Sequence, residues 1–292
     1  MLMKRFFLIS AFFTIFVSYS WSQNIQDPVE QYNLAFKYLD GDGVPVDKSK
    51  AVYWFQKSAE QGFAMAQGAL GMCYMNGNGV VKDATKGVYW YRKAAEQGDA
   101  LSQYNLGMSY YMGDGVRQNY TESFNWIKKA AEQGLVNAQT FIGYCYQNGI
   151  GITKNNTEAV KWYIKAAEAG EPLGQVNLGL CYMNGEGVIK NYTEGIKWTL
   201  KAAEQGEPSA QYNMGIYYHE GQGVNKDFSK ALYWFEKSAI QGSPYAQFCL
   251  GDYYYKGLGV TKDIQKAKYW YQKAADQGHQ DAKNILNLLN RY

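Results

Sequence analysis

The sequence predicts an all-α protein in which seven copies of a 36-residue helix–turn–helix unit stack into a solenoid. Two recurring residues predict it, because a fixed period of about 20 to 50 residues marks a repeat architecture. A glycine ends each segment, at Gly62, Gly98, Gly134, Gly170, Gly206, Gly242 and Gly278. A tryptophan recurs inside each segment, at Trp54, Trp90, Trp126, Trp162, Trp198, Trp234 and Trp270.

Two more columns keep the same register, and together the four set the repeat boundaries. Glutamine recurs at Gln31, Gln67, Gln103, Gln139, Gln175, Gln211 and Gln247. Tyrosine recurs at Tyr38, Tyr74, Tyr110, Tyr146, Tyr182, Tyr218 and Tyr254. The predicted repeats are residues 27–62, 63–98, 99–134, 135–170, 171–206, 207–242 and 243–278.

The N-terminal residues 1–22 have the pattern of an export signal. Lys4 and Arg5 form a short basic region, and residues 6–17 form an apolar run typical of signal peptides. The alternative is a membrane anchor, but this run is shorter than the roughly 20 residues that a spanning helix needs.

Small residues at Ser20 and Ser22 match the positions that signal peptidase reads, so we expect cleavage between Ser22 and Gln23. No cysteine follows the apolar run, which excludes a bacterial lipoprotein anchor. We therefore expect an exported bacterial protein, periplasmic or secreted, with no membrane span after cleavage.

The charge of the chain argues against nucleic acid as the main partner. The formal net charge is +3, from 29 basic and 26 acidic residues. Removing Lys4 and Arg5 with the signal leaves 27 basic against 26 acidic residues, a net charge of +1. A nearly neutral chain without a basic run lacks the charge that phosphate backbones attract.

The second repeat shows how one unit should fold. Ala66, Leu70 and Tyr74 follow each other at intervals of four, which predicts one stripe of a helix over residues 64–75. Gly71 beside that stripe would let a neighbouring helix approach closely. The second helix is expected over residues 84–97, with Trp90 and Ala94 on its buried side and Gly98 at its end.

The loop between the two helices carries the turn chemistry. Gly77 and Gly79 tolerate the positive φ that ends a helix, and Asp83 is placed to cap the next one. The capping column reads Asp47, Asp83, Asn119, Asn155, Asn191, Asp227 and Asp263. Three of its asparagines also match the N-glycosylation sequon, which matters only in a eukaryotic source. The G-x-G loops follow a helix and lack a third glycine, so we interpret them as turns rather than phosphate-binding loops.

The sequence has few residues that could bind a metal or act as a nucleophile. We therefore expect no catalytic, cofactor-binding or metal-binding residues. His219 and His279 lie in different repeats, and each is interpreted as a solvated surface histidine. Cys145 and Cys181 occupy equivalent positions of adjacent repeats, too far apart for a disulfide if their helices are packed neighbours. The cysteines are expected to be buried thiols, at Cys73, Cys145, Cys181 and Cys249.

The stretch GMCYMNGNGVVKDATKGVYWYRKAAEQG, residues 71–98, resembles the Sel-one-like repeat (SLR), a relative of the tetratricopeptide repeat. The resemblance covers residues 27–278, with minor departures at Ala35 and Ile240. It implies a right-handed superhelix of paired antiparallel helices used as an interaction scaffold. Residues 279–292 are then a C-terminal capping helix.

A surface for a partner is expected opposite the packed stripe of the first helices. A solvated helix face should be charged, yet this one is rich in Met, Tyr and Leu, and exposed apolar surface marks binding sites. By analogy with tetratricopeptide arrays this face is concave. The predicted partner-binding residues are Met72, Tyr104, Met108, Tyr111, Tyr144, Leu180, Tyr212 and Ile216. The alternative is that these side chains pack between neighbouring repeats.

The sequence thus favours an exported, monomeric, non-enzymatic scaffold for a protein or peptide. The family resemblance implies envelope, host-interaction or toxin-immunity roles. One alternative is a β-lactamase-like hydrolase, as claimed for cysteine-rich relatives, but the S-x-x-K, S-D-N and K-T-G signatures are absent from this sequence. A glycan or peptidoglycan binder is the other alternative, since aromatic rings stack on sugars, although the tryptophan column is needed for the core.

Overall fold

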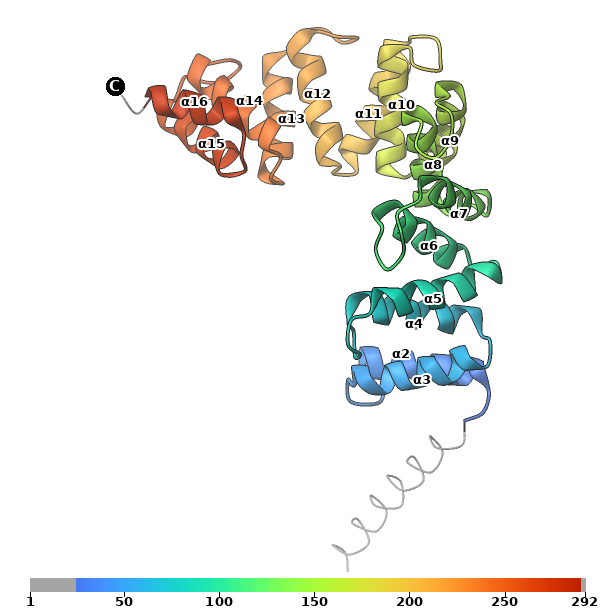
Figure 1. Ribbon diagram of the computed structural model, residues 1–292. Helices are drawn as coiled ribbons and strands as arrows, with labels where there is room; N and C mark the ends of the chain where they lie inside the picture. The colour runs from blue at the N-terminus through green and yellow to red at the C-terminus, as the bar shows by residue number, and fades with distance from the viewer. Residues whose placement is uncertain (1–24, 290–292) are drawn as a thin grey trace, which may run out of the picture. The chain divides into compact units, whose positions relative to one another are not determined.

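The predicted all-α solenoid is confirmed by the computed structural model, which describes residues 25–289 (Figure 1). These residues form fifteen helices and no strand. The predicted export signal, residues 1–22, lies outside the described residues. The helices group into two compact units, Met1–Leu135 and Val136–Tyr292.

Each repeat contributes a first and a second helix, in that order along the chain. In the first unit the first helices are α2 (Pro28–Asp40), α4 (Ala64–Asn76) and α6 (Ala100–Met112). Its second helices are α3 (Lys48–Glu60), α5 (Ala84–Glu96) and α7 (Tyr120–Glu132). Within this unit, each second helix packs against the first helix of its own repeat, and α3 and α5 also pack against the first helix of the next repeat.

The second unit repeats this order and ends in the predicted cap. Its first helices are α8 (Val136–Asn148), α10 (Pro172–Asn184), α12 (Pro208–Glu220) and α14 (Pro244–Lys256). Its second helices are α9 (Asn156–Glu168), α11 (Tyr192–Glu204), α13 (Phe228–Ile240) and α15 (Ile264–Asp276). The capping helix α16 (Gln280–Leu289) packs against α15.

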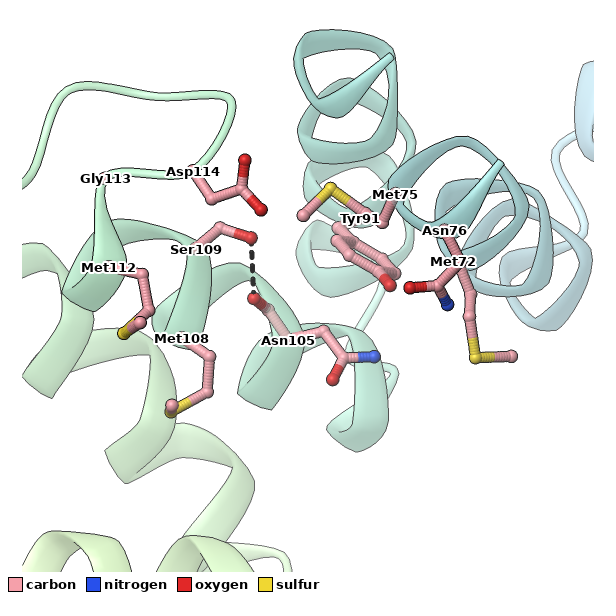
Figure 2. Close-up of a pocket in the computed structure, with 10 residues that line it drawn as sticks. All are labelled: Met72, Met75, Asn76, Tyr91, Asn105, Met108, Ser109, Met112, Gly113 and Asp114. Carbon is pink, nitrogen blue, oxygen red and sulfur yellow. Dashed lines mark hydrogen bonds between the residues drawn. The ribbon is translucent and has the colours of Figure 1, made fainter. Parts of the chain in front are cut away.

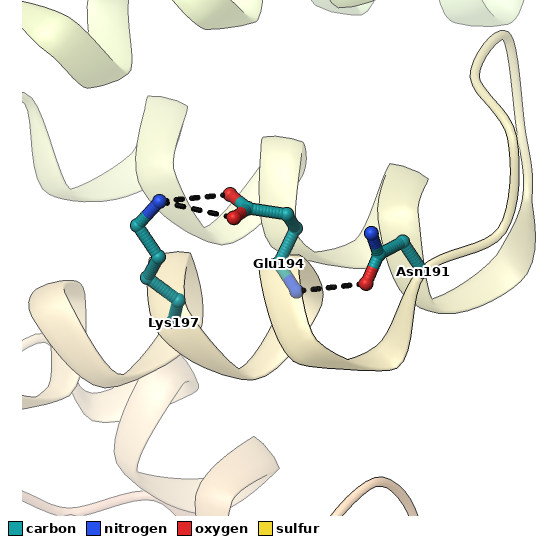
Figure 3. A network of polar contacts seen from close by, with 3 residues as sticks. All are labelled: Asn191, Glu194 and Lys197. Carbon is teal, nitrogen blue, oxygen red and sulfur yellow. Dashed lines mark hydrogen bonds and ion pairs between the residues drawn. The ribbon is translucent and has the colours of Figure 1, made fainter.

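The predicted capping column is confirmed in all seven repeats, and it takes two forms. Asp83 accepts a hydrogen bond from the backbone N–H of Lys86 and also pairs with the Lys86 ammonium at 3.5 Å. Asn191 instead accepts from the backbone N–H of Glu194, whose carboxylate binds Lys197 at 3.0 Å (Figure 3). The neutral cap therefore occurs with an acidic third residue, which the helix N-terminus favours. The asparagines of the sequons are these neutral caps.

The interpretation of the G-x-G loops as turns is also confirmed. Gly77 ends α4 at a φ of +72°, and Gly79 has the same φ. A Cβ on Gly79 would overlap the backbone carbonyl of Lys48, at the start of the preceding second helix. The second glycine of the loop is therefore required by close contact between repeats as well as by its φ.

Glycine also allows the two helices of a repeat to pack closely, as expected for Gly71. A Cβ at this position would lie 2.7 Å from a ring carbon of Tyr91 on α5. Gly143 and Gly251 meet Tyr163 and Tyr271 in the same way. A tyrosine ring therefore fills the volume that a side chain on the first helix would need.

The buried glutamine column joins neighbouring helices through amide pairs. Gln67 Nε2 donates to the Ala59 carbonyl at 3.1 Å, and its Oε1 accepts from Gln97 Nε2 at 2.8 Å. The same side-chain pair forms in six repeats, between Gln31–Gln61, Gln67–Gln97, Gln103–Gln133, Gln175–Gln205, Gln211–Gln241 and Gln247–Gln277. In the fourth repeat Ala169 stands where the second glutamine would be. The column thus serves the core rather than a ligand.

The thiols are free, as expected, and three of them are buried, whereas Cys249 is only half-buried. Burial raises the pKa of Cys73 to about 11 and the pKa of Cys145 to about 12. These side chains are therefore protonated and poorly nucleophilic at neutral pH.

The expectation that both histidines are simply solvated is wrong. His219 Nδ1 lies 2.7 Å from the Tyr253 hydroxyl oxygen, with which it shares a hydrogen bond. The His279 ring stacks on Phe248 with the ring centroids 4.4 Å apart. Both side chains are half-buried because the aromatic residues around them belong to the same packed layer of helices.

Candidate functional site

A pocket of about 680 Å³ opens between α4, α5 and α6 of the first unit (Figure 2). Two of the predicted partner-binding residues, Met72 and Met108, lie in its wall. The ten lining residues are Met72, Met75, Asn76, Tyr91, Asn105, Met108, Ser109, Met112, Gly113 and Asp114. The two first helices and the loop after α6 contribute all of them except Tyr91, which α5 contributes.

Methionine dominates the apolar part of the wall. Four of the nine methionines of the chain line this one pocket. Met72 and Met112 are 44% and 67% exposed, whereas Met75 packs over Gly87 in the first turn of α5. A Cβ on Gly87 would lie 2.5 Å from the Met75 sulfur, so the glycine makes room for this thioether. Unbranched, polarisable side chains can adapt this surface to the shape of an apolar group.

The polar part of the wall contains groups that lack an internal partner. Tyr91 is only 5% exposed, and its hydroxyl points into the space between Asn76 and Asn105 (Figure 2). Within residues 25–289 no hydrogen bond reaches this hydroxyl or the side-chain amides of these two asparagines. Burial raises the pKa of Tyr91 to about 12, so the hydroxyl keeps its proton. The hydroxyl oxygen reaches the solvent of the pocket, so water or a ligand can be its hydrogen-bond partner.

Asp114 is the charged residue of the wall, and it lies at the start of the loop that follows Gly113. Its carboxylate faces the Met75 side chain across the pocket (Figure 2). The Ser109 hydroxyl needs no hydrogen-bond partner from a ligand, because it donates to the Asn105 backbone carbonyl at 3.0 Å. The pocket thus offers one hydroxyl donor, one carboxylate and two amides within a methionine-rich surface.

The other two predicted residues of the first unit lie outside the pocket lining. Tyr104 is half-buried, and burial raises its pKa. The Tyr111 ring packs against Tyr120, with the ring centroids 5.4 Å apart. Both rings belong to the predicted face, but the structure does not bring them to the pocket wall.

The predicted residues of the second unit divide in their exposure. Tyr144 is 41% exposed, whereas Leu180, Tyr212 and Ile216 are half-buried and pack against core clusters. At two other positions of the same face, Val176 and Met183 are 5% and 2% exposed. These two side chains are therefore buried, and Gly195 on the facing helix leaves the space that Met183 fills.

Sequence reasoning missed Tyr91, Asn105 and Asp114. Tyr91 follows the tryptophan column directly, and nothing in the pattern of one helix marks its hydroxyl as facing a pocket. Asn105 lies between Tyr104 and the buried Leu106, at the edge of the buried side of α6. Its exposure therefore depends on the rotation of α6 about its own axis. Asp114 is the middle residue of a G-x-G loop, where its departure from the uncharged Asn78 of the preceding repeat was the available signal.

Residues 25–289 contain no group of three or more His, Cys, Asp or Glu residues placed to hold a metal ion. In that same range, no helix combines the length and apolarity that crossing a membrane requires.

Stacked helix pairs with a pocket between successive first helices define a repeat scaffold. The chain belongs to the Sel1 repeat family. The Sel1 repeat model matches seven times, at residues 31–63, 64–99, 100–135, 136–171, 172–207, 208–243 and 244–279. No curated protein matches the chain.

Solved structures share this fold. A protective antigen present in uropathogenic Escherichia coli strains, which displays an SLR fold, is 40% identical, with a TM-score of 0.78. The alignment covers 90% of this chain and 56% of that one, so this chain spans little more than half of the antigen's chain. A Sel1 repeat protein from Oxalobacter formigenes is 34% identical, with a TM-score of 0.78, over 90% of this chain and 76% of that one. Yeast Tom70 is 13% identical, with a TM-score of 0.52, over 93% and 56%, and shares the fold alone.

Proposed function

We propose that this protein is an exported, non-enzymatic scaffold that binds a protein or peptide through the first-helix face of its first unit. The observation that carries the proposal is the pocket of about 680 Å³, whose wall combines four methionines with the Tyr91 hydroxyl. The volume suits the insertion of side chains, since ligand pockets span about 300–1,000 Å³. Among the lining residues, Ser109 is bound to its own helix, and no histidine or lysine accompanies it.

A polypeptide fits this surface because apolar side chains extend beyond the pocket itself. The same two first helices expose Met65 by 51% and Leu101 by 54%. Exposed apolar groups next to an adaptable pocket are typical of a protein-binding surface. The envelope, host-interaction and toxin-immunity roles implied by the family resemblance all require such a partner surface.

Met108→Glu should abolish partner binding and leave the fold nearly intact. Met108 is half-buried in the pocket wall, so a carboxylate can reach water in the free protein but is buried when a partner docks. A buried, unpaired charge at the centre of an interface should weaken binding by about 100-fold or more. The measurement is affinity capture of partners from envelope extract of the source cell, with circular dichroism melts of each variant.

The matched control is Val81→Glu, since Val81 is 86% exposed in a loop of the second repeat and lies outside the pocket. A protein captured by the wild type and by Val81→Glu, but not by Met108→Glu, supports the proposed surface. Equal capture by all three would move the partner site off this face. A large drop in melting temperature for Met108→Glu would show that the side chain packs in the core.

Export is a separate part of the proposal, and it has its own test. Mature protein isolated from the exporting cell should begin at Gln23, because Ser20 and Ser22 satisfy signal peptidase. We take the protective-antigen description of the Escherichia coli relative as further support. Intact-mass measurement checks the prediction, and an unprocessed N-terminus would support the membrane anchor instead.

A further inference from the structure

The fourth repeat contains a polar bridge at the place where the second repeat has its pocket wall. Tyr163 is equivalent to Tyr91, and Gln147 is equivalent to Met75, each 72 residues further along the chain. The Tyr163 hydroxyl donates to Gln147 Oε1 at 2.7 Å. Gln147 Nε2 donates to the carboxylate of Glu186 at 3.0 Å. One side-chain carboxamide thus connects a buried hydroxyl to a loop carboxylate.

The second repeat has the hydroxyl and the carboxylate of this bridge but lacks the carboxamide that connects them. Tyr91 supplies the hydroxyl, and Asp114 supplies the carboxylate at the position equivalent to Glu186. Met75 replaces the glutamine, and a thioether cannot connect the two groups, because it is only a weak acceptor and has no hydrogen to donate to the carboxylate. In the seventh repeat, the tyrosine of this column again has a partner, since Tyr271 donates to Asp252 at 2.6 Å. Tyr91 is the tyrosine of this column whose hydroxyl faces an open pocket.

We propose that the pocket binds a side-chain carboxamide of the partner polypeptide beside Met75, where it connects the Tyr91 hydroxyl to Asp114 as the Gln147 carboxamide connects Tyr163 to Glu186 in the fourth repeat. This inference rests on the proposed peptide-binding function and names the chemistry of the bound group. The carboxamide oxygen accepts from the Tyr91 hydroxyl, and its N–H donates to Asp114. A carboxylate of the same shape cannot donate to Asp114 and is repelled by it, and an ammonium cannot accept from Tyr91.

The apolar wall fits the stem of a glutamine side chain. Its methylene groups would contact the thioethers of Met72, Met75 and Met108, which line the approach to the two polar ends. A peptide bond carries the same amide chemistry without such a stem. The test therefore separates a side-chain amide from a backbone amide.

The probes are three tripeptides, Gly-Gln-Gly, Gly-Glu-Gly and Gly-norleucine-Gly, acetylated at the N-terminus and N-methylamidated at the C-terminus so that no terminal primary carboxamide is present. The full chain, labelled with ¹³C at its methionine methyl groups, reports binding through the NMR signals of Met72, Met75, Met108 and Met112. Gly-Gln-Gly should shift these signals, and Gly-Glu-Gly should bind about tenfold more weakly. If norleucine matches glutamine, the side-chain carboxamide does not contribute to binding, and the inference is overturned. If no tripeptide shifts the four signals, or the glutamate peptide binds as well as the glutamine peptide, the inference is overturned.

A substitution in the chain itself can supply the missing carboxamide. Met75→Gln copies the fourth repeat and should fill the pocket with the chain's own carboxamide, weakening Gly-Gln-Gly by about tenfold or more. Met75→Gln/Gly87→Ala copies it more closely, because Ala159 is the residue opposite Gln147. The matched control is Leu39→Gln in the first repeat, where Phe55 offers no hydroxyl, and it should leave binding unchanged. Circular dichroism melts confirm that each variant is folded.

The two proposals fail separately. If folded Met75→Gln binds the tripeptide as tightly as the wild type, the carboxamide inference is wrong. The proposed function survives that result if Met108→Glu still loses the captured partner. Tyr91→Phe removes only the hydroxyl and should reproduce the loss of Gly-Gln-Gly binding while the methionine wall stays intact. Unchanged tripeptide binding by Tyr91→Phe would remove the hydroxyl from the site.

Discussion

Trp162→Ala should lower the free energy of unfolding by about 3–5 kcal/mol, the usual loss on truncating a buried aromatic side chain. The indole lies on α9 and is only 8% exposed. Its outer face is covered by Lys165, whose Nζ lies 4.1 Å from the ring centroid. Removing the ring leaves a cavity that the surrounding side chains can fill only in part. Urea or thermal unfolding followed by circular dichroism measures the loss.

Tyr89→Ala is the matched control for this substitution. Tyr89 lies on α5 next to Trp90, and its ring is 51% exposed. Its ring contacts are an edge contact with Trp90 and the nearby Lys93 ammonium, so its removal should cost less than about 1 kcal/mol. If Trp162→Ala loses no more stability than Tyr89→Ala, the tryptophan column does not form the core.

The fold could be predicted from sequence because every repeat carries the same residues at the positions that start and end its helices. Asp83 and its equivalents cap a helix through their own side chains, and Gly77 ends one through its own φ, whatever lies nearby. Such local signals, repeated seven times at a constant interval, leave one architecture consistent with all of them. The boundaries of α4 and α5 follow directly from these signals.

The site could be predicted only in part, because exposure depends on pairs of residues from different helices. Met72 and Met108, whose columns vary and lie opposite the packed stripe, are the two predicted residues that lie in the pocket wall. Met183 belongs to the same face but is buried, because Gly195 on the facing helix leaves space for its sulfur. Periodicity within one helix reports nothing about the size of the residue opposite.

The hydroxyl of Tyr91 also could not be assigned from the pattern of a single helix. Its column is buried, and the pattern predicts a core residue, which is correct for the ring. Whether its hydroxyl has a partner is decided by position 75, where methionine stands instead of the glutamine found at position 147. The difference between methionine and glutamine at this position indicates a missing hydrogen-bond partner only because the structure shows Tyr163 donating to Gln147.

Gly115→Ala should lower the free energy of unfolding by roughly 2–5 kcal/mol, from two separate causes. Gly115 has a φ of +72°, which strains any residue with a Cβ. That Cβ would also overlap the backbone carbonyl of Ala84, the first residue of α5. A backbone carbonyl cannot rotate away as a side chain can, so the loop must shift from its neighbouring repeat.

Gly98→Ala separates these two causes within the same unit. Gly98 has a φ of +95°, but a Cβ there would meet no atom within 4 Å. This variant should lose only the strain energy of about 1–3 kcal/mol, less than Gly115→Ala. The measurement is paired chemical unfolding of the two variants and the wild type. Equal losses would mean that the loop moves freely away from α5, so that contact between repeats does not require glycine at position 115.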